Sequence, residues 1–219
     1  MKIGTDGVLL GAWTDCLNRD NILDVGTGTS VIALMMAQRN PSAKIYAIEI
    51  DEEAAQQASD NVSNSSWSKR IQVINQSIQD YWKATTQQFD HIVTNPPFFT
   101  GGTLSHNQDK TSVRHTTKLS HSDLLGAVRN LLSDNGTFSL ILPAIEGYRC
   151  IEMAKTYNLY PCRLTEVYPD QAKPLERLLV TFSKREKTYT IDRLYIRDSN
   201  SGDFNEQYKE LTKAFYLKF

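Results

Sequence analysis

The stretch that decides the fold is Asn21-Ile22-Leu23-Asp24-Val25-Gly26-Thr27-Gly28, an apolar run that ends in two closely spaced glycines. The branched aliphatic side chains of its first half predict a short buried strand. Glycine allows the backbone to turn tightly and to approach a ligand closely. The next residues, 31–37, predict a helix that is buried on more than one side. A strand that turns through glycines directly into a helix indicates a sheet with helices packed against it.

The same alternation of strands and helices continues along most of the chain. Further strands are predicted at 43–49, 71–74, 89–94, 136–142, 159–167 and 178–182, and helices at about 51–62, 124–132 and 146–157. We therefore expect an α/β fold with a central, mostly parallel seven-stranded sheet that carries helices on both faces.

Two segments stand apart from this pattern. Residues 96–120 are rich in Gly, Thr, Ser, His and Lys and predict a long substrate loop, because loops of this length inside a domain are usually functional or disordered. Residues 189–196 predict one more strand and 206–215 a closing helix, which together form a C-terminal appendage over about 185–219. Because the sequence contains no repeat or linker, we expect one domain over residues 1–219.

Composition and cysteine usage exclude several classes of protein. The chain has 219 residues, of which 40% are hydrophobic and 22% charged, as in ordinary globular proteins. Three cysteines make an odd number, and no Cys or His has the spacing of a zinc ligand, so we expect reduced thiols and no metal. The sequence shows no apolar run that could span a bilayer and no signal-peptide core at its start. We expect a cytoplasmic protein without membrane contact or an obligate protein partner.

The charges are divided unevenly along the chain. In total, 24 Lys and Arg residues face 25 Asp and Glu residues, a net charge of −1, which argues against a strongly basic nucleic-acid binder. Residues 1–100 hold 7 basic and 11 acidic side chains, a net of −4, whereas residues 101–219 hold 17 and 14, a net of +3. The second half could therefore attract phosphate, although any single cation can be ordinary surface charge.

An acidic residue lies on each side of the glycine turn. Asp24 precedes the glycines, and Glu49 ends the second predicted strand, where a carboxylate can accept hydrogen bonds from the ribose of a nucleoside cofactor. The alternatives are an ordinary β–α turn and a solvated carboxylate. The dinucleotide fingerprint G-x-G-x-x-G is incomplete because Val31 occupies its third glycine position. This disfavours an NAD(P) oxidoreductase.

The turn resembles motif I of S-adenosylmethionine (SAM)-dependent methyltransferases, D-x-G-x-G-x-G. The resemblance implies that Asp24 holds the amino-acid end of SAM and that Glu49 holds its ribose. Ser30 stands where that family usually has its third glycine. After the third strand, where these enzymes often place an acid near the adenine, this chain has Ser77 and Ile78. The residues implied in cofactor binding at these positions are Asp24, Gly26, Gly28, Glu49, Ser77 and Ile78.

Asn95-Pro96-Pro97-Phe98 is the most specific motif in the chain, and it follows the predicted strand 89–94. Open α/β sheets place their chemistry at this edge. The Asn side chain and the Pro96 carbonyl are two acceptors that could hold the hydrogens of an amine or carboxamide, leaving the nitrogen free to attack a methyl donor. Phe98 could stack on an extruded base. We expect these four residues to be catalytic; the alternative is that they only terminate a strand.

Several stretches resemble the bacterial tRNA1(Val) adenine-N6 methyltransferases over nearly the whole chain. They are Met1-Lys2-Ile3-Gly4-Thr5-Asp6-Gly7-Val8-Leu9-Leu10-Gly11-Ala12-Trp13, Asn95-Pro96-Pro97-Phe98-Phe99, Val113-Arg114-His115, Phe138-Ser139-Leu140-Ile141-Leu142-Pro143 and Phe215-Tyr216-Leu217. The resemblance implies a Rossmann-like class I methyltransferase fold, SAM as cofactor and tRNA as partner. It implies methylation of the adenosine at position 37, beside the anticodon. The family usually has a short segment before this opening stretch, so we expect a truncated start or a missing part of the cofactor or tRNA surface.

The resemblance also adds site residues. Thr5 and Asp6 lie in a segment that covers the cofactor side of the site in this family, so they are candidate cofactor contacts; alternatively, they cap a helix over 8–13. For the substrate we expect contacts from Phe99, Lys110, Arg114, His115 and Lys118 in the long loop. The same N-P-P-F chemistry could instead methylate a protein glutamine or an rRNA base. The remaining alternative is a protein that binds SAM without catalytic activity. The intact motifs disfavour it.

Overall fold

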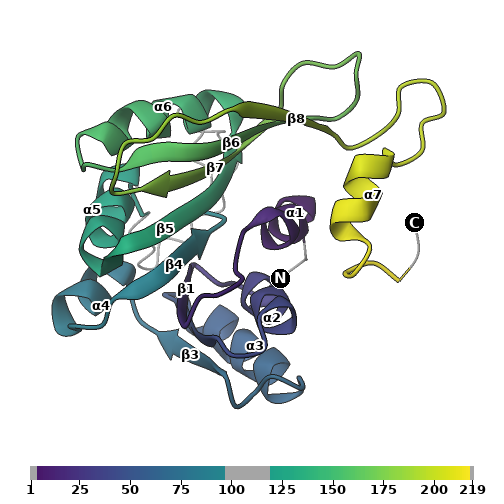
Figure 1. Cartoon of the computed structure of the whole chain (residues 1–219). Coiled ribbons are helices and arrows are strands. Elements are labelled where there is room, and N and C mark those ends of the chain that lie inside the picture. The colour runs from purple at the N-terminus through teal and green to yellow at the C-terminus, as the bar shows by residue number, and fades with distance from the viewer. Residues whose placement is uncertain (1–3, 97–118, 218–219) are drawn as a thin grey trace, which may run out of the picture.

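A computed structural model describes residues 4–96 and 119–217, and its strands form one sheet in the order β3-β2-β1-β4-β5-β7-β6-β8 (Figure 1). The strands are β1 (Asn21–Val25), β2 (Lys44–Glu49), β3 (Ile71–Asn75), β4 (Phe89–Thr94), β5 (Leu132–Pro143), β6 (Tyr160–Tyr168), β7 (Arg177–Ser183) and β8 (Ile191–Tyr195). Strands β1 to β5 are parallel, β7 is antiparallel to both of its neighbours, and β8 is parallel to β6. This confirms the expected α/β class with a mostly parallel sheet.

The sheet has eight strands within the described residues, so the expected number of seven is wrong. The strand that was expected in the C-terminal appendage joins the sheet as β8, which pairs with β6 from Leu164↔Ile191 to Tyr168↔Tyr195. The pairing is favourable because β6 would otherwise be an edge strand with unpaired backbone groups, which proteins tend to cover.

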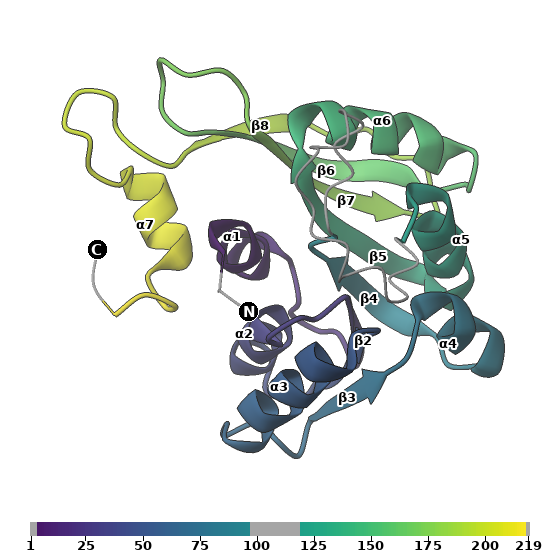
Figure 2. The ribbon, with the colours of Figure 1, turned by 180° about the vertical axis from the view of Figure 1, so that it is seen from behind.

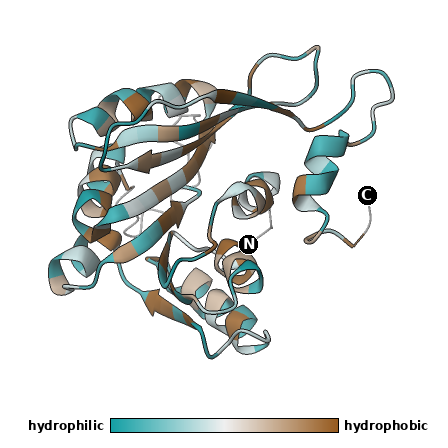
Figure 3. Cartoon of the chain, in the orientation of Figure 1, coloured by the Kyte–Doolittle hydropathy of each residue, from teal (hydrophilic) through white to brown (hydrophobic). Residues whose placement is uncertain are grey.

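Helices cover both faces of the sheet, as Figures 1 and 2 show from opposite sides. One face carries α1 (Thr5–Trp13), α2 (Val31–Arg39) and α3 (Glu52–Ser63), and the other carries α4 (Ile78–Ala84), α5 (His121–Leu131) and α6 (Ala144–Lys155). Each face has its own buried cluster, with Leu10 and Met36 in the first and Phe89 and Phe138 in the second. Figure 3 shows hydrophobic residues along the central strands that separate these clusters.

Helix α4 was not predicted from the sequence, although a capping signal was present. Ser77 is its N-cap, and its Oγ accepts a hydrogen bond from the Asp80 N–H at 3.1 Å and donates one to Asp80 Oδ2 at 2.7 Å. A Ser followed three residues later by an acid is the sequence signature of a helix start. The helix has only seven residues, too short for a clear apolar period.

Helix α1 begins earlier than expected. Its N-cap is Gly4, without a side-chain capping bond, and Thr5 and Asp6 lie inside the first turn. The alternative that Thr5 or Asp6 caps a helix starting at residue 8 is therefore wrong. The tertiary structure gives Asp6 a different partner, Arg177 of β7, whose Nε lies 2.9 Å from Asp6 Oδ2.

The C-terminal residues pack onto the N-terminal helices. After β8 the chain forms a loop and then α7 (Glu206–Thr212), whose Tyr208 is fully buried with Leu9 and Trp13 of α1. Phe215 and Tyr216 pack against Val8 and Met35. Figure 1 shows the result, with α1 lying between the sheet and α7.

Candidate active site

The candidate site lies where the carboxyl ends of four parallel strands meet. Val25 at the end of β1 pairs with Ile48 of β2 and with Thr94 of β4, and Glu49 of β2 pairs with Asn75 of β3. The strand order reverses between β1 and β4, because β2 and β3 lie on one side of β1 and β4 on the other. Such a switch point opens a crevice at the carboxyl edge, where open α/β sheets bind ligands.

Three residues of the turn after β1 have left-handed backbone conformations. Gly26 has φ +69°, Gly28 has φ +57° and Ser30 has φ +60°. A side chain at Gly26 would point into open space, because a Cβ added there would have nothing within 4 Å. Gly26 therefore keeps room for a ligand, whereas Ser30 adopts, against the steric preference of its side chain, a conformation that glycine adopts freely. At the position of the third glycine of the D-x-G-x-G-x-G motif, Ser30 thus has a backbone conformation that glycine favours.

Asp24 presents a buried carboxylate with one unused oxygen. Its Oδ2 accepts a hydrogen bond from Thr27 Oγ1 at 2.6 Å, whereas its Oδ1 has no partner among the described residues. The residue is fully buried, and burial raises its pKa to about 7, with the nearby charge of Glu49 acting in the same direction. A buried acceptor without a partner is costly, and a cationic ligand would relieve that cost. The sequence did not single out Thr27, which lies only three residues from Asp24.

Glu49 is held by two backbone N–H groups. Its Oε2 accepts from Gly28 at 2.9 Å and its Oε1 from Asp51 at 3.1 Å, and the residue is 9% exposed. Each carboxylate oxygen has a further lone pair. The side chain is thus fixed in place and can still accept two hydrogen bonds from a ligand.

Ser77 and Ile78 lie next to Glu49, after β3. The Gln76 N–H and the Asn75 side chain both donate to the Glu49 carbonyl oxygen, at 3.0 Å and 2.9 Å. This ties the segment that starts at Ser77 to the end of β2. Ser77 uses its hydroxyl to cap α4, and Ile78 is buried against the sheet.

Asn95 and Pro96 follow β4 directly. The Asn95 Oδ1 is buried and has no hydrogen-bond partner among the described residues. Helix α1 passes over this side chain, since a Cβ at Gly7 would lie 3.9 Å from Asn95 Nδ2. Asn95 and Pro96 line a cavity of about 740 Å³ together with Thr5 and Asp6. A second unpaired buried acceptor thus lies at the carboxyl edge, at the wall of a cavity.

The structure therefore divides the predicted residues into two sets. Asp24, Gly28 and Glu49 are joined around the turn after β1, with Ser77 beside them, whereas Thr5 and Asp6 lie in the cavity of Asn95 and Pro96. Arg177, which pairs with Asp6 in this cavity, was missed because no short-range signal links residues 171 positions apart. The remaining predicted residues lie outside the described part of the chain: Pro97, Phe98, Phe99, Lys110, Arg114, His115 and Lys118.

Neither a metal cluster nor a membrane span is found in the part of the chain that the structure describes. No group of three or more His, Cys, Asp or Glu side chains in residues 4–96 and 119–217 could hold an ion. No helix within these ranges is long and apolar enough to cross a bilayer.

The chain matches known methyltransferases in sequence. Residues 4–158 match the family model described as the methyltransferase small domain. A tRNA1(Val) (adenine(37)-N6)-methyltransferase of Haemophilus influenzae is 42% identical over 100% of this chain and 93% of its own length. A protein of the same name from Bacteroides fragilis is 40% identical, over 100% of this chain and 92% of its length.

Solved structures share the fold at lower sequence identity. A predicted O-methyltransferase of Agrobacterium tumefaciens superposes with a TM-score of 0.71 at 19% identity, covering 95% of this chain and 96% of that one. TrmN of Thermus thermophilus superposes with a TM-score of 0.59 at 18% identity, covering 82% of this chain and 48% of that one. These similarities confirm the Rossmann-like class I methyltransferase fold.

Proposed function

The chain belongs to the family of tRNA1(Val) (adenine(37)-N6)-methyltransferases, and from this premise we propose that it methylates N6 of adenosine 37 in tRNA1(Val). It is a SAM-dependent methyltransferase, as expected from its sequence. The observation that carries the proposal for its substrate is identity of about 40% over the whole chain to enzymes of that name. The alternatives, a protein glutamine or an rRNA base, have no such support.

The residues at the turn after β1 fit SAM. SAM supplies the activated methyl group and carries a positively charged amino group, a carboxylate and a ribose. Asp24 Oδ1 is buried without a partner among the described residues and suits the amino group, and the fixed Glu49 carboxylate suits the two ribose hydroxyls. Gly26, Gly28, Ser77 and Ile78 are proposed to complete the cofactor site, and Thr5 and Asp6 of α1, which line the cavity of Asn95, are proposed as further cofactor contacts.

Asn95 and Pro96 are proposed to hold the target amine. The adenine N6 carries two hydrogens, and its lone pair is delocalised into the ring. Asn95 Oδ1 and the Pro96 carbonyl are acceptors that can take one hydrogen each. By holding both hydrogens, they would let the nitrogen pyramidalise, which localises its lone pair for attack on a methyl donor, and they would stabilise the positive charge that develops on it until the methylated nitrogen loses a proton. Pro97 would fix the backbone, and Phe98 would stack on the base.

We propose that basic residues of the long loop form part of the surface that binds the RNA substrate. Phe99, Lys110, Arg114, His115 and Lys118 are proposed to contact the RNA around the target base. We also propose that residues 1–219 act as one domain, supported by the burial of Tyr208 with α1. Its function on tRNA implies that the protein works in the cytoplasm.

One experiment tests the proposal. The full chain is incubated with methyl-labelled SAM and unmethylated tRNA1(Val), and the digested nucleosides are separated. We expect label in N6-methyladenosine and its loss when adenosine 37 is replaced by guanosine. Label on protein or on another nucleoside, or no label in the tRNA, would contradict the proposal.

A further inference from the structure

Two loops from different parts of the fold line the same cavity as Asn95. The β6–β7 loop includes Pro169 to Lys173, and the β8–α7 loop includes Ile196 to Phe204. Pro169 and Lys173 of the first loop and Ile196, Arg197 and Phe204 of the second contribute to the cavity lining, as do Asn95 and Pro96. Whatever fills this cavity beside the target nucleotide therefore touches both loops.

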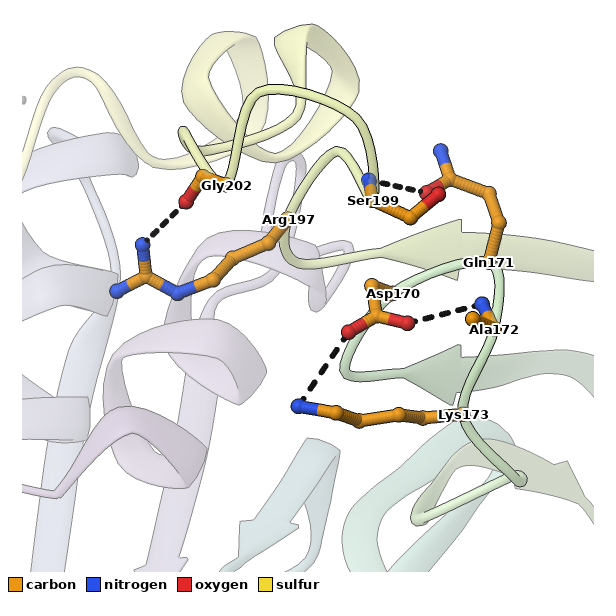
Figure 4. A network of polar contacts seen from close by, with 7 residues as sticks. All are labelled: Asp170, Gln171, Ala172, Lys173, Arg197, Ser199 and Gly202. Atoms are coloured by element: carbon orange, nitrogen blue, oxygen red, sulfur yellow. Dashed lines mark hydrogen bonds and ion pairs between the residues drawn. The ribbon is translucent and has the colours of Figure 1, made fainter.

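The two loops are tied into one unit. Arg197 N–H donates to the Pro169 carbonyl at 2.9 Å. Figure 4 shows a second link, in which the Ser199 N–H donates to Gln171 Oε1 at 2.8 Å. Backbone pairing continues from β8, where Ile196 N–H donates to the Tyr168 carbonyl at 2.9 Å. Side chains that project from these loops are therefore held in a defined position relative to the sheet.

Arg197 is the best placed cation of this unit. Its guanidinium lies 4.5 Å above the centre of the Phe204 ring and donates one hydrogen bond to the Gly202 carbonyl at 2.8 Å. Phe204 in turn stacks on the buried Tyr208, with ring centres 5.3 Å apart and planes at 16°. Stacking on an aromatic face fixes the plane of the guanidinium fork at little entropic cost on binding.

The charge of Arg197 is not neutralised. Among the described residues it has no carboxylate within ion-pair distance, and its side chain is exposed at the cavity. This sets it apart from Arg177 in the same cavity, which pairs with Asp6 and Glu176. A guanidinium has five N–H donors, of which the Gly202 carbonyl takes one, so an anion can be bound by the others.

Lys173 adds a second cation beside it. Its ammonium lies 3.4 Å from Asp170 Oδ2 and its side chain is 62% exposed. The other oxygen of Asp170 accepts from the Ala172 N–H at 2.8 Å. Figure 4 shows the side chains of Lys173 and Arg197 extending in the same direction, away from their loops and toward the N-terminal elements.

We propose that Arg197, supported by Lys173, is a phosphate-binding subsite that holds the RNA backbone of a nucleotide next to the target adenosine. The inference rests on the proposed function, since it assigns a place to the same RNA. An exposed guanidinium that is oriented by an aromatic ring binds phosphate with two parallel hydrogen bonds. The cavity joins it to Asn95, so an RNA strand whose target base lies at Asn95 has its neighbouring backbone within this cavity.

The test measures how RNA binding depends on salt. A fluorescein-labelled anticodon stem–loop of tRNA1(Val) is titrated with the full chain at several salt concentrations. For Arg197→Ala we expect affinity to fall about tenfold and the slope of log K against log salt to become shallower by about 0.7–0.9, as for one lost phosphate contact. Arg197→Lys should keep the slope and recover part of the affinity, because it keeps the charge without the planar fork.

Matched controls separate this role from a structural one. Arg149→Ala removes an exposed cation of α6, outside the cavity lining, and should leave affinity and slope unchanged. Melting temperature and SAM affinity show whether each variant is folded. If Arg197→Ala is not folded, Lys173→Ala decides the question, and we expect a shallower slope for it as well.

The outcomes distinguish this inference from the proposed function. If a folded Arg197→Ala variant binds RNA with the same slope and affinity as wild type, the subsite is overturned while tRNA methylation stands. If Arg197→Ala does not fold, the same result for Lys173→Ala overturns the subsite. Arg197-dependent RNA binding without methylation at adenosine 37 would overturn the proposed function and leave the subsite. Absence of RNA binding by the wild-type chain at every salt concentration would overturn both.

Discussion

The Gly28 N–H donates a hydrogen bond to Glu49 Oε2 at 2.9 Å, which joins the turn after β1 to the end of β2. The same turn is tied to β2 by its backbone, since the Gly26 and Thr27 N–H groups both donate to the Ile48 carbonyl, at 2.8 Å and 3.0 Å. A carboxylate that is held in place before a ligand arrives loses little entropy on binding. This relationship gives Glu49 a structural role beside its proposed role in binding the ribose, and the two roles can be separated by mutation.

We expect Glu49→Gln to weaken SAM binding about 10-fold to 100-fold, because hydrogen bonds to a charged group contribute about 1.5–3 kcal/mol. The Gln side-chain oxygen can still accept from Gly28, so the turn should keep its shape. Isothermal titration with SAM measures the affinity. Glu52→Gln in the first turn of α3 is the matched control, and undiminished SAM affinity in Glu49→Gln would exclude the role assigned to Glu49.

The affinity for SAM should depend on pH through Asp24. Burial raises its pKa to about 7 in the protein without ligand, so the carboxylate that would bind the SAM amino group is formed only above that pH. We therefore expect the dissociation constant of SAM to rise as the pH is lowered from 8 to 6, by up to about tenfold per pH unit below 7. Titrations at several pH values check this, and a flat profile for wild type across that range would contradict it.

Asp24→Asn should stabilise the protein without ligand at high pH. The pKa of Asp24 rises from its ordinary value of 3.8 to about 7 in the fold, so the folded state binds the proton more tightly than the unfolded state. Stability from this group is therefore present below pH 4 and is lost as the pH rises through 7, at a cost on the order of 2–4 kcal/mol. We expect Asp24→Asn to melt at a higher temperature than wild type at pH 8 but not at pH 4, with SAM binding lost. A lower melting temperature of the variant at pH 8 would show that the buried charge of Asp24 does not destabilise the folded protein.

Asn95→Ala should abolish methyl transfer and leave SAM affinity within about threefold of wild type, because the oxygens proposed to bind SAM belong to Asp24 and Glu49 and not to Asn95. Its Oδ1 is a buried acceptor without a partner among the described residues, so its removal should cost the fold little. We expect kcat to fall by about 100-fold or more, as when a group that stabilises the transition state is removed. Initial rates with tRNA and titration with SAM measure the two effects, and a variant that methylates at the wild-type rate would refute the role of Asn95.

Ser30→Gly and Ser30→Val should differ clearly in stability. Ser30 has φ +60°, a conformation that costs a non-glycine residue about 1–2 kcal/mol. Glycine removes this strain at a comparable cost in chain entropy, so Ser30→Gly should alter the free energy of unfolding by less than about 1 kcal/mol. Ser30→Val adds branching at the same φ and should lower stability by more than about 2 kcal/mol. Chemical denaturation measures both, and equal stability of the two variants would show that the conformation is not strained.

Much of the fold was predictable because its elements are defined locally. The apolar runs of β1 and β4 and the helical spacing of α3 each lie within a few neighbouring residues, and the structure confirms them. Helix α4 was missed because seven residues carry too little periodicity. The eighth strand was expected, but its place in the sheet was not, because pairing with β6 is decided by backbone groups distant in sequence.

The candidate site, like the fold, was predictable only in part from the sequence. Asp24, Glu49 and Asn95 could be identified from the sequence because each lies at or near the end of a strand, and parallel neighbours bring such ends to one edge. The environment of these residues could not be identified. The burial that raises the pKa of Asp24, the ion pair of Asp6 with Arg177, and the presence of Arg197 and Lys173 in one cavity lining all depend on segments far apart in the chain.

The sequence by itself determined the order of strands and helices, the family and the residue types offered for binding and methyl transfer, because these depend on local pattern and side-chain chemistry. Only the tertiary structure decided which of these groups are buried without partners and which cations face the cavity. Burial and pairing depend on packing among distant segments. This packing leaves Asp24 Oδ1 and Asn95 Oδ1 without partners among the described residues and places Arg197 in the same cavity lining as Asn95.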